Sequence, residues 1–302
     1  MTLVLIGAGG FLGSHLAAHL AGRGEAVLPL SYRPERHRAF LDAFLDMIRA
    51  GPPSAVLYAG GSQNGRDDAV ALEELSLSNV VLPAAIAALL RDHAPECCLV
   101  TYGTSWQTGE QGVEEPFNAY AASKTAAEAF LRHFALDGVR SATLRLYDTY
   151  GPGDRRNKVV NLIADAIARR SDLAMSSGGQ VIELVHVRDV LAATDATLAE
   201  LRQGPPGRHL VYAVRSGQPL RILDVLATML RVAGLEKAEF IRPGVYPYRR
   251  RERFALFPDT PTPPGWRPVV PLEAGLRELI EERRRIAGAA GAPRASDPAA
   301  MG

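Results

Sequence analysis

The first half of the chain alternates short apolar runs with longer segments of helical periodicity, and few folds accommodate that order. The apolar runs cover residues 3–7, 26–31, 55–60, 97–102 and 141–147. Helical patterns lie between them, near residues 11–22, 35–50, 68–93 and 119–136. Uninterrupted apolar strands are buried on both faces, and this alternation is typical of parallel strands joined by crossover helices. We therefore predict an α/β fold with a doubly wound parallel sheet.

A glycine-rich segment follows the first apolar run. Residues 7–13 are Gly-Ala-Gly-Gly-Phe-Leu-Gly, and a helical pattern begins within this segment, near residue 11. Such glycines permit a tight turn, a close approach of backbone N–H groups to a pyrophosphate, and close helix–strand packing. We therefore predict a Rossmann-type dinucleotide site formed by the following residues: Gly7, Gly10, Phe11, Leu12 and Gly13.

The end of the second apolar run indicates which dinucleotide is bound. The chain is Ser31-Tyr32-Arg33 at this point, where an NAD-binding domain usually places an acidic residue against the ribose 2′-hydroxyl. No carboxylate is present, and Arg33 would meet a 2′-phosphate with positive charge. We predict that Ser31, Tyr32 and Arg33 contact the cofactor and that the cofactor is NADP.

Tyr120 and Lys124 are four residues apart in a predicted helix and therefore share one of its faces. A nearby ammonium lowers the pKa of a phenol from about 10. Tyr120 would then exchange a proton with a carbon-bound oxygen while hydride moves to or from the nicotinamide. Thr104, or its neighbour Ser105, follows a predicted strand at the sheet edge where ligands bind, and would orient that oxygen.

These motifs, in this order, resemble the extended short-chain dehydrogenase/reductase family, which includes the NAD-dependent epimerases and dehydratases of nucleotide sugars. The resemblance covers nearly all of residues 1–280 and extends to several further segments: Tyr58-Ala59-Gly60, Asn79, and residues 144–152, 185–190 and 265–266. It implies that Ala59 and Gly60 bind the cofactor. One departure is that the chain has room for only one helix between the second strand and residue 55, so the family's additional strand is absent.

The resemblance also implies substrate-facing residues. Asp148 matches a position that faces the substrate in relatives, and Ser105 adjoins the threonine. Arginines that converge on a diphosphate bind it in bidentate fashion. From the basic clusters at 155–158 and 248–251 we select Lys158 and Arg249 as substrate ligands.

The residues after Thr104 favour one reaction. Dehydratases of the family carry an Asp-Glu pair there, because eliminating water needs its own acid and base, whereas this chain has Ser105-Trp106. Residues 146–151, 181–187 and 247–249 look most like 4-ketoreductases of the abequose and paratose synthase kind. We therefore expect NADPH-dependent reduction of the 4-keto group of a nucleotide-linked deoxysugar, with Tyr120 as proton donor. An NAD-dependent 4-epimerase and a non-catalytic dinucleotide sensor remain as alternatives.

The domain organisation is predicted from a change in sequence composition near residue 150, after which Gly- and Pro-rich clusters appear. We expect a nucleotide-binding domain over residues 1–150 and a smaller substrate-binding lobe over 151–286, with strands that could rejoin the main sheet. The Ala/Gly/Pro-rich residues 287–302 are expected to be disordered.

Bulk properties exclude several partner classes. A net charge of +1 gives no electrostatic footprint for nucleic acid, and no uninterrupted apolar stretch reaches membrane-spanning length. We expect no signal peptide, no disulfide between the adjacent Cys97 and Cys98, and no metal site, and hence a cytoplasmic enzyme. The Ala- and Leu-rich segments 68–93 and 119–136 predict a homodimer, because in the family this helix pair forms a four-helix interface.

Overall fold

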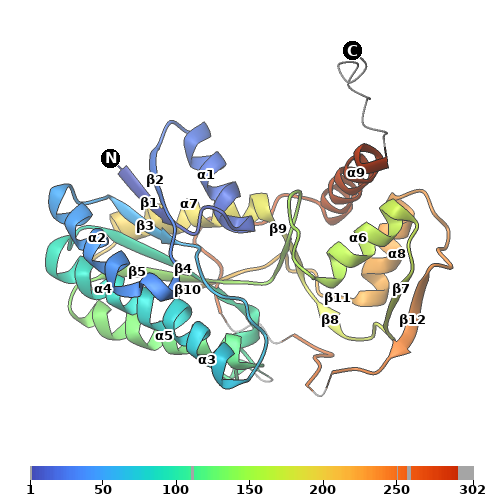
Figure 1. Ribbon diagram of the computed structural model, residues 1–302, viewed down its shortest axis with the longest axis horizontal. Coiled ribbons are helices and arrows are strands. Elements are labelled where there is room, and N and C mark those ends of the chain that lie inside the picture. Colours follow the sequence, from blue (N-terminus) through green and yellow to red (C-terminus); the bar gives the residue numbers. More distant parts are fainter. Residues whose placement is uncertain (1, 110–111, 250, 257–259, 292–302) are drawn as a thin grey trace, which may run out of the picture. The chain divides into compact units, whose positions relative to one another are not determined.

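The computed structural model describes residues 2–109, 112–249, 251–256 and 260–291 (Figure 1). The chain forms two compact units. Unit 1 comprises Met1–Thr149, Val181–Pro219 and Arg253–Val270, and unit 2 comprises Tyr150–Gln180, Leu220–Glu252 and Pro271–Gly302. The division differs from the expected single boundary near residue 150, since two later segments of the chain also belong to unit 1.

Unit 1 is built on a six-stranded parallel sheet with the order β10-β5-β4-β3-β1-β2. Its strands are β1 (Thr2–Ile6), β2 (Ala26–Leu30), β3 (Ala55–Tyr58), β4 (Cys98–Thr104), β5 (Arg140–Leu146) and β10 (His209–Val214). Its helices are α1 (Phe11–Gly22), α2 (His37–Ala50), α3 (Ala69–Leu75), α4 (Leu82–His93), α5 (Ala119–Leu136) and α7 (Val187–Gln203). Short elements complete it: η1 (Pro34–Arg36), the π-helical turn η2 (Ser76–Val81), η3 (Ser105–Gln107), β8 (Val181–Ile182) and β9 (Leu184–His186), with β6 (Asp148–Tyr150) crossing into unit 2. The predicted doubly wound α/β fold is confirmed.

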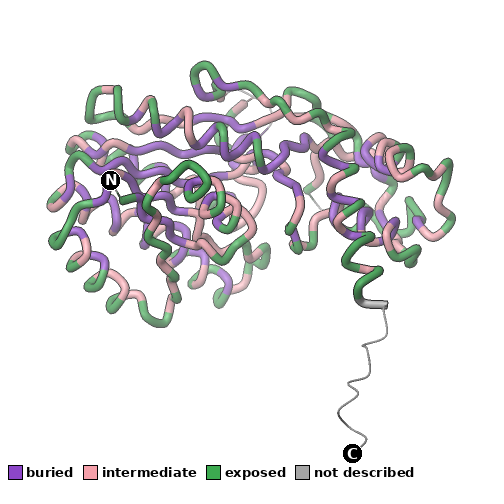
Figure 2. Tube along the Cα trace, turned by 90° about the horizontal axis from the view of Figure 1, so that it is seen from above, coloured by how far each residue is buried: buried purple, intermediate pink, exposed green. Residues whose placement is uncertain are grey.

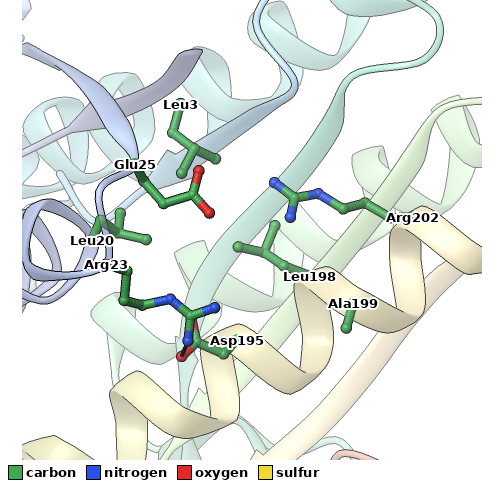
Figure 3. Close-up of a pocket in the computed structure, with 8 residues that line it drawn as sticks. All are labelled: Leu3, Leu20, Arg23, Glu25, Asp195, Leu198, Ala199 and Arg202. Carbon is green, nitrogen blue, oxygen red and sulfur yellow. Dashed lines mark hydrogen bonds and ion pairs between the residues drawn. The ribbon is translucent and has the colours of Figure 1, made fainter. Parts of the chain in front are cut away.

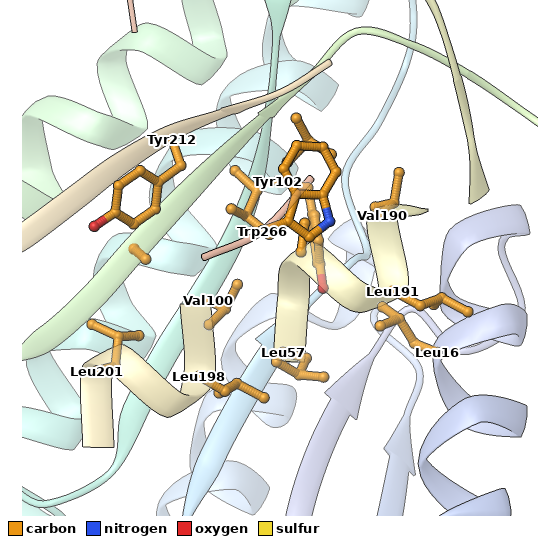
Figure 4. Close-up of a cluster of buried hydrophobic side chains, with 14 of the residues drawn as sticks. Leu16, Leu57, Val100, Tyr102, Val190, Leu191, Leu198, Leu201, Tyr212 and Trp266 are labelled. Carbon is orange, nitrogen blue, oxygen red and sulfur yellow. The ribbon is translucent and has the colours of Figure 1, made fainter. Parts of the chain in front are cut away.

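The inner strands β1, β3, β4 and β5 bury side chains on both faces of the sheet, because successive residues point to opposite sides, whereas the edge strand β2 is exposed or partly buried throughout. Leu3 and Leu5 belong to a core cluster with α1 and α7 (Figure 4), whereas Val4 and Ile6 belong to a second cluster with α2, α4 and α5. Figure 1 shows these helix layers on either side of the sheet, and Figure 2 shows how the buried residues gather inside unit 1. Each fully buried aliphatic side chain contributes roughly 1.5–3 kcal/mol, so the two layers fix the sheet firmly.

The strand order reverses beside β1, and this positions the site. The chain goes from β1 to the edge strand β2 and then crosses back to β3, with only η1 and α2 between β2 and β3. The carboxyl ends of β1 and β3 therefore flank the point where the order reverses, which is where doubly wound sheets bind ligands. At the other edge, β10 pairs with β5, so one strand from beyond residue 151 does rejoin the sheet.

Unit 2 contains α6 (Val159–Arg169), α8 (Ile222–Val232) and α9 (Leu272–Gly291), which pack on one another. It also contains the parallel pair β7 (Leu173–Ser176) and β12 (Ile241–Tyr246), and the short β11 (Leu220–Arg221). The expected disordered tail from residue 287 is wrong over its first residues, because α9 continues to Gly291. Residues 292–302 of that prediction lie outside the described residues.

One helical stretch in the described chain, Ala69–His93, is long and apolar enough to span a membrane by length and composition alone. It comprises α3, η2 and α4, and α4 packs against α2 and α5 within unit 1. Core helices of soluble proteins meet the same criterion, so the stretch is weak evidence for a membrane. Cys97 and Cys98 are both buried as free thiols.

A cavity of about 90 Å³ lies between α1, the start of β1 and α7 (Figure 3). Its lining includes Leu3 near the start of β1 and Glu25 just before β2. Asp195 at its rim accepts hydrogen bonds from His19 at 2.7 Å and Arg23 at 3.1 Å. The cavity is therefore at the amino ends of the strands, opposite the edge at which the cofactor is predicted to bind.

Candidate active site

The predicted dinucleotide loop is packed so tightly that side chains are excluded at two of its glycines. Gly7 has φ +91°, and a Cβ on it would lie 2.5 Å from the Cα of Gly60, in the loop just after β3. A Cβ on Gly13 would collide with the Gly7 carbonyl oxygen. By contrast, a Cβ on Gly9 would meet no atom within 4 Å, and Gly10 caps α1 without any side-chain hydrogen bond. A helix N-terminus with a glycine turn in front of it fits a pyrophosphate.

Phe11 and Leu12 open α1, and Ala59 and Gly60 directly follow β3, so the structure places these predicted cofactor residues on the same sheet edge as Gly7. The Ala59 N–H donates to the Ile6 carbonyl at 2.9 Å, which ties the β3 loop to the β1 loop.

Ser31, Tyr32 and Arg33 follow β2 along the same edge. The Tyr32 hydroxyl hydrogen-bonds His37 Nδ1 at 3.0 Å and its ring packs edge-on against Phe40. Arg33 is exposed and forms no ion pair with a described residue. The loop therefore offers a cation beside the cofactor edge, which fits a 2′-phosphate.

Tyr120 and Lys124 lie on the first turns of α5, whose N-cap is Asn118. The Asn118 side-chain oxygen accepts the Ala121 N–H at 2.9 Å, which fixes where the helix begins. Lys124 Nζ lies 5.8 Å from the centroid of the Tyr120 ring. Burial lowers the pKa of the Lys124 ammonium to about 8. The predicted pair is thus brought together in a poorly solvated environment.

Asn79, known from the sequence only as a part of the resemblance, faces Lys124. A Cβ on Gly61 would lie 2.5 Å from Asn79 Oδ1 and 2.7 Å from Lys124 Nζ, so both atoms border the same small space. The Asn79 amide nitrogen donates to Ser62 O at 3.0 Å and to Ser123 Oγ at 2.9 Å, while Oδ1 is buried with no hydrogen-bond partner among the described residues. Asn79 lies in the π-helical turn η2, a feature that often occurs at functional sites.

Thr104 ends β4 and caps η3. Its hydroxyl oxygen accepts the Trp106 N–H at 3.3 Å, and its own N–H donates to Gln107 Oε1 at 2.9 Å. Ser105 is buried, and the half-buried Trp106 packs against Phe117 with ring centroids 5.1 Å apart. The hydroxyl that was predicted to orient the reacting oxygen is therefore fixed at the strand end.

Sequence reasoning did not include Arg253 in the site. Its guanidinium donates to the carbonyls of Ser105 at 3.1 Å and Trp106 at 3.3 Å, and lies 5.5 Å from the Phe117 ring centroid. Burial lowers its pKa, whereas the negative charge of Asp148 acts in the opposite direction. Asp148, the predicted substrate ligand, thus lies within electrostatic reach of Arg253. Only tertiary structure could reveal this, because nearly 150 residues separate Arg253 from Ser105.

The remaining predicted ligands, Lys158 and Arg249, belong to unit 2. Lys158 immediately precedes α6, and Arg249 is exposed. Their roles stay predictions. Among the described residues no three His, Cys, Asp or Glu side chains group as a metal site.

The fold and the glycine loop define a dinucleotide-binding Rossmann-type protein with a Tyr/Lys pair at the binding edge. Residues 3–213 match the model of the NAD dependent epimerase/dehydratase family. The chain belongs to that family, as the sequence resemblance predicted.

Individual relatives agree with this assignment. The chain is 27% identical over 301 residues to GDP-6-deoxy-D-mannose reductase from Pseudomonas aeruginosa, covering 93% of this chain and 96% of the relative. It is 24% identical to CDP-abequose synthase from Yersinia pseudotuberculosis, covering 64% of this chain and 71% of that protein. The solved structure of RMD from Pseudomonas aeruginosa complexed with NADPH is similar with a TM-score of 0.76 at 23% identity, covering 94% of this chain and 99% of that one.

Proposed function

We propose that this protein reduces the 4-keto group of a nucleotide-linked deoxysugar with NADPH. The observation that carries the proposal is the set of residues around Thr104. The two residues that follow it are Ser105 and Trp106, so the acid and base that water elimination needs are missing there, while the Tyr120/Lys124 pair that carbonyl reduction needs is present. The similarity to GDP-6-deoxy-D-mannose reductase supports the same chemistry.

The cofactor would be held by Gly7, Gly10 and Gly13 at the pyrophosphate and by Arg33 at the 2′-phosphate. NADPH, when bound, supplies the hydride. Tyr120 donates the proton of its phenol hydroxyl to the carbonyl oxygen. Lys124 stabilises the phenolate that this leaves, and the Thr104 hydroxyl orients the oxygen that accepts the proton.

The proposal that the substrate is a nucleotide sugar is supported by positively charged side chains. Arg253 carries positive charge beside Ser105 and Asp148 in unit 1. Lys158 and Arg249 stay the ligands predicted from the sequence. Cations of this kind suit the diphosphate of a nucleotide sugar.

A panel of nucleotide-linked 4-keto sugars with GDP, CDP, dTDP and UDP carriers tests the proposal. We expect one NADPH to be oxidised for each sugar reduced, measured by absorbance and by product mass. Interconversion of 4-hydroxy sugars without net cofactor consumption would instead identify a 4-epimerase. Tight NADPH binding with no turnover on any member of the panel would identify a sensor.

A further inference from the structure

Gln107 connects the strand end that carries Thr104 to the helix that carries Tyr120 and Lys124. Its side chain is completely buried at the end of η3. Gln107 Oε1 accepts the Thr104 backbone N–H at 2.9 Å, and Gln107 Nε2 donates to Glu128 Oε1 at 2.7 Å. An ionised carboxylate only accepts hydrogen bonds, so the amide has one orientation that satisfies both partners.

Glu128 anchors the other end of this connection. It lies on α5, four residues after Lys124 and eight after Tyr120, with 1% of its surface exposed. Arg145 on β5 donates two hydrogen bonds to its carboxylate, from Nε to Oε1 at 3.0 Å and from Nη2 to Oε2 at 2.7 Å. A bidentate pair of this kind is geometrically specific. Gln107, Glu128 and Arg145 therefore form a continuous buried bridge from β4 through α5 to β5, which we call the Gln107 bridge.

The backbone makes room for the bridge. A Cβ at residue 103 would collide with Gln107 Oε1, so the glycine before Thr104 leaves the space that the Gln107 amide occupies. Arg145 also donates to Thr108 Oγ1 at 3.3 Å, which ties the chain just after η3 to the same guanidinium. Both flanks of the Thr104–Gln107 turn are thus held by one network.

We propose that Gln107 is a positioning residue for the reduction: by joining Thr104 to Glu128, it sets the separation between the Thr104 hydroxyl and the phenol of Tyr120. This inference rests on the proposed function. A local cap alone would need only the Oε1 contact to Thr104, whereas the Nε2 contact to Glu128 crosses to another element. Misplacement of a reacting group by about 1 Å can cost 10²-fold in rate.

Two substitutions distinguish the hydrogen bond from Gln107 to Thr104 from the one to Glu128. Gln107→Leu removes both hydrogen bonds. Gln107→Glu keeps an acceptor for the Thr104 N–H but, when ionised, cannot donate to Glu128. We expect Gln107→Leu to lower kcat 10- to 100-fold, with KM and NADPH affinity changed less than threefold. A carboxyl buried against Glu128 has a raised pKa and donates a hydrogen bond only while protonated, so kcat of Gln107→Glu, taken relative to wild type at each pH, should fall at least fivefold as the pH rises from 6 to 9, whereas that of Gln107→Leu should stay equally low throughout.

Coupling to Thr104 is tested by a double-mutant cycle. In a Thr104→Val background there is no hydroxyl left to position, so Gln107→Leu should lower kcat less than threefold further. Thr197→Val, which removes a buried hydroxyl hydrogen-bonded to Ala193 O in α7, is the matched control and should leave kcat unchanged. Equal losses in both backgrounds, or wild-type kcat in Gln107→Leu, would overturn the proposal.

Hydrogen exchange gives a readout that needs no substrate. Loss of the Gln107 acceptor should speed exchange of the Thr104 amide about tenfold, as expected for a hydrogen bond worth about 1.4 kcal/mol. Unchanged exchange in Gln107→Leu would refute the bridge itself. If the exchange changes but the wild-type protein reduces no nucleotide-linked 4-keto sugar, the bridge stands and the proposed function fails.

Discussion

At the residue scale, Tyr120 and Thr104 make different contributions that substitution can separate. Tyr120→Phe keeps the ring and removes only the titrating hydroxyl, so turnover should fall roughly 10²–10⁴-fold while NADPH binding survives. Thr104→Val removes an orienting hydrogen bond and leaves the proton source, so its loss should be smaller. Steady-state kinetics with NADPH titration by fluorescence measures both. Near-normal turnover in Tyr120→Phe would contradict the assigned mechanism.

Lys124 is expected to destabilise the folded protein and yet to be needed for turnover. Burial lowers its pKa from 10.5 to about 8, so the unfolded chain keeps this proton at pH values where the native state has lost it. The free energy of unfolding therefore decreases as the pH falls from about 10.5 to about 8. Below about pH 8 the whole cost of burying the charged ammonium applies. Lys124→Met should raise the free energy of unfolding of the cofactor-free protein at pH 7 by on the order of 1–3 kcal/mol, and should abolish turnover.

Urea unfolding at pH 7 tests this prediction, with Lys237→Met as the control. Lys237 is exposed and pairs only with Glu239 at 3.1 Å among the described residues, so its replacement should change stability little. A Lys124→Met protein that is less stable than wild type would show that the ammonium makes compensating contacts.

Arg33 is expected to set the cofactor preference. An arginine that hydrogen-bonds a phosphate contributes roughly 1.5–3 kcal/mol, so Arg33→Ala should weaken NADPH binding at least tenfold and leave NADH binding nearly unchanged. Arg38→Ala, an exposed arginine on α2, is the matched control. Tighter binding of NADH than NADPH by the wild-type protein would refute the preference.

At the scale of elements, the two glycines Gly13 and Gly9 make a matched pair in the cofactor loop. A Cβ on Gly13 would collide with backbone of residue 7, whereas a Cβ on Gly9 would meet nothing within 4 Å. Gly13→Ala should therefore destabilise unit 1 by several kcal/mol and prevent NADPH binding. Gly9→Ala should fold normally, as judged by thermal unfolding. A Gly13→Ala protein with wild-type stability would show that the loop can rearrange.

The same elements show how far the sequence predicts the fold. Strands such as β1 and β4 were predictable because both of their faces are buried and their residues are therefore continuously apolar. The strand β10 was expected only as a possibility, since its pairing with β5 joins distant segments. Gln107 could not have been found, because its role depends on Glu128 and Arg145 meeting it through tertiary packing. By contrast, Tyr120 and Lys124 were found because helical periodicity alone brings them together.

At the scale of the whole molecule, the predicted homodimer has a surface that would suit it. The helices α3, α4 and α5 with η2 lie side by side and leave apolar side chains exposed, including Val70, Leu72, Val81, Phe130 and Leu136. Helix faces of this composition are commonly buried by a second copy related by twofold symmetry. We expect the wild-type protein to be a dimer at micromolar concentration by light scattering.

A charge on that surface should dissociate the dimer. Phe130 on α5 is 48% exposed, and a carboxylate there would be buried without a partner in a symmetric interface, where it would also approach its own copy. Phe130→Glu should therefore give a folded monomer, with the far-UV circular dichroism spectrum of the wild type. Leu162→Glu, at a comparably exposed apolar position on α6, should remain dimeric and so controls for nonspecific effects of an added charge. A monomeric wild-type protein, or a dimeric Phe130→Glu variant, would show that α5 does not form the interface.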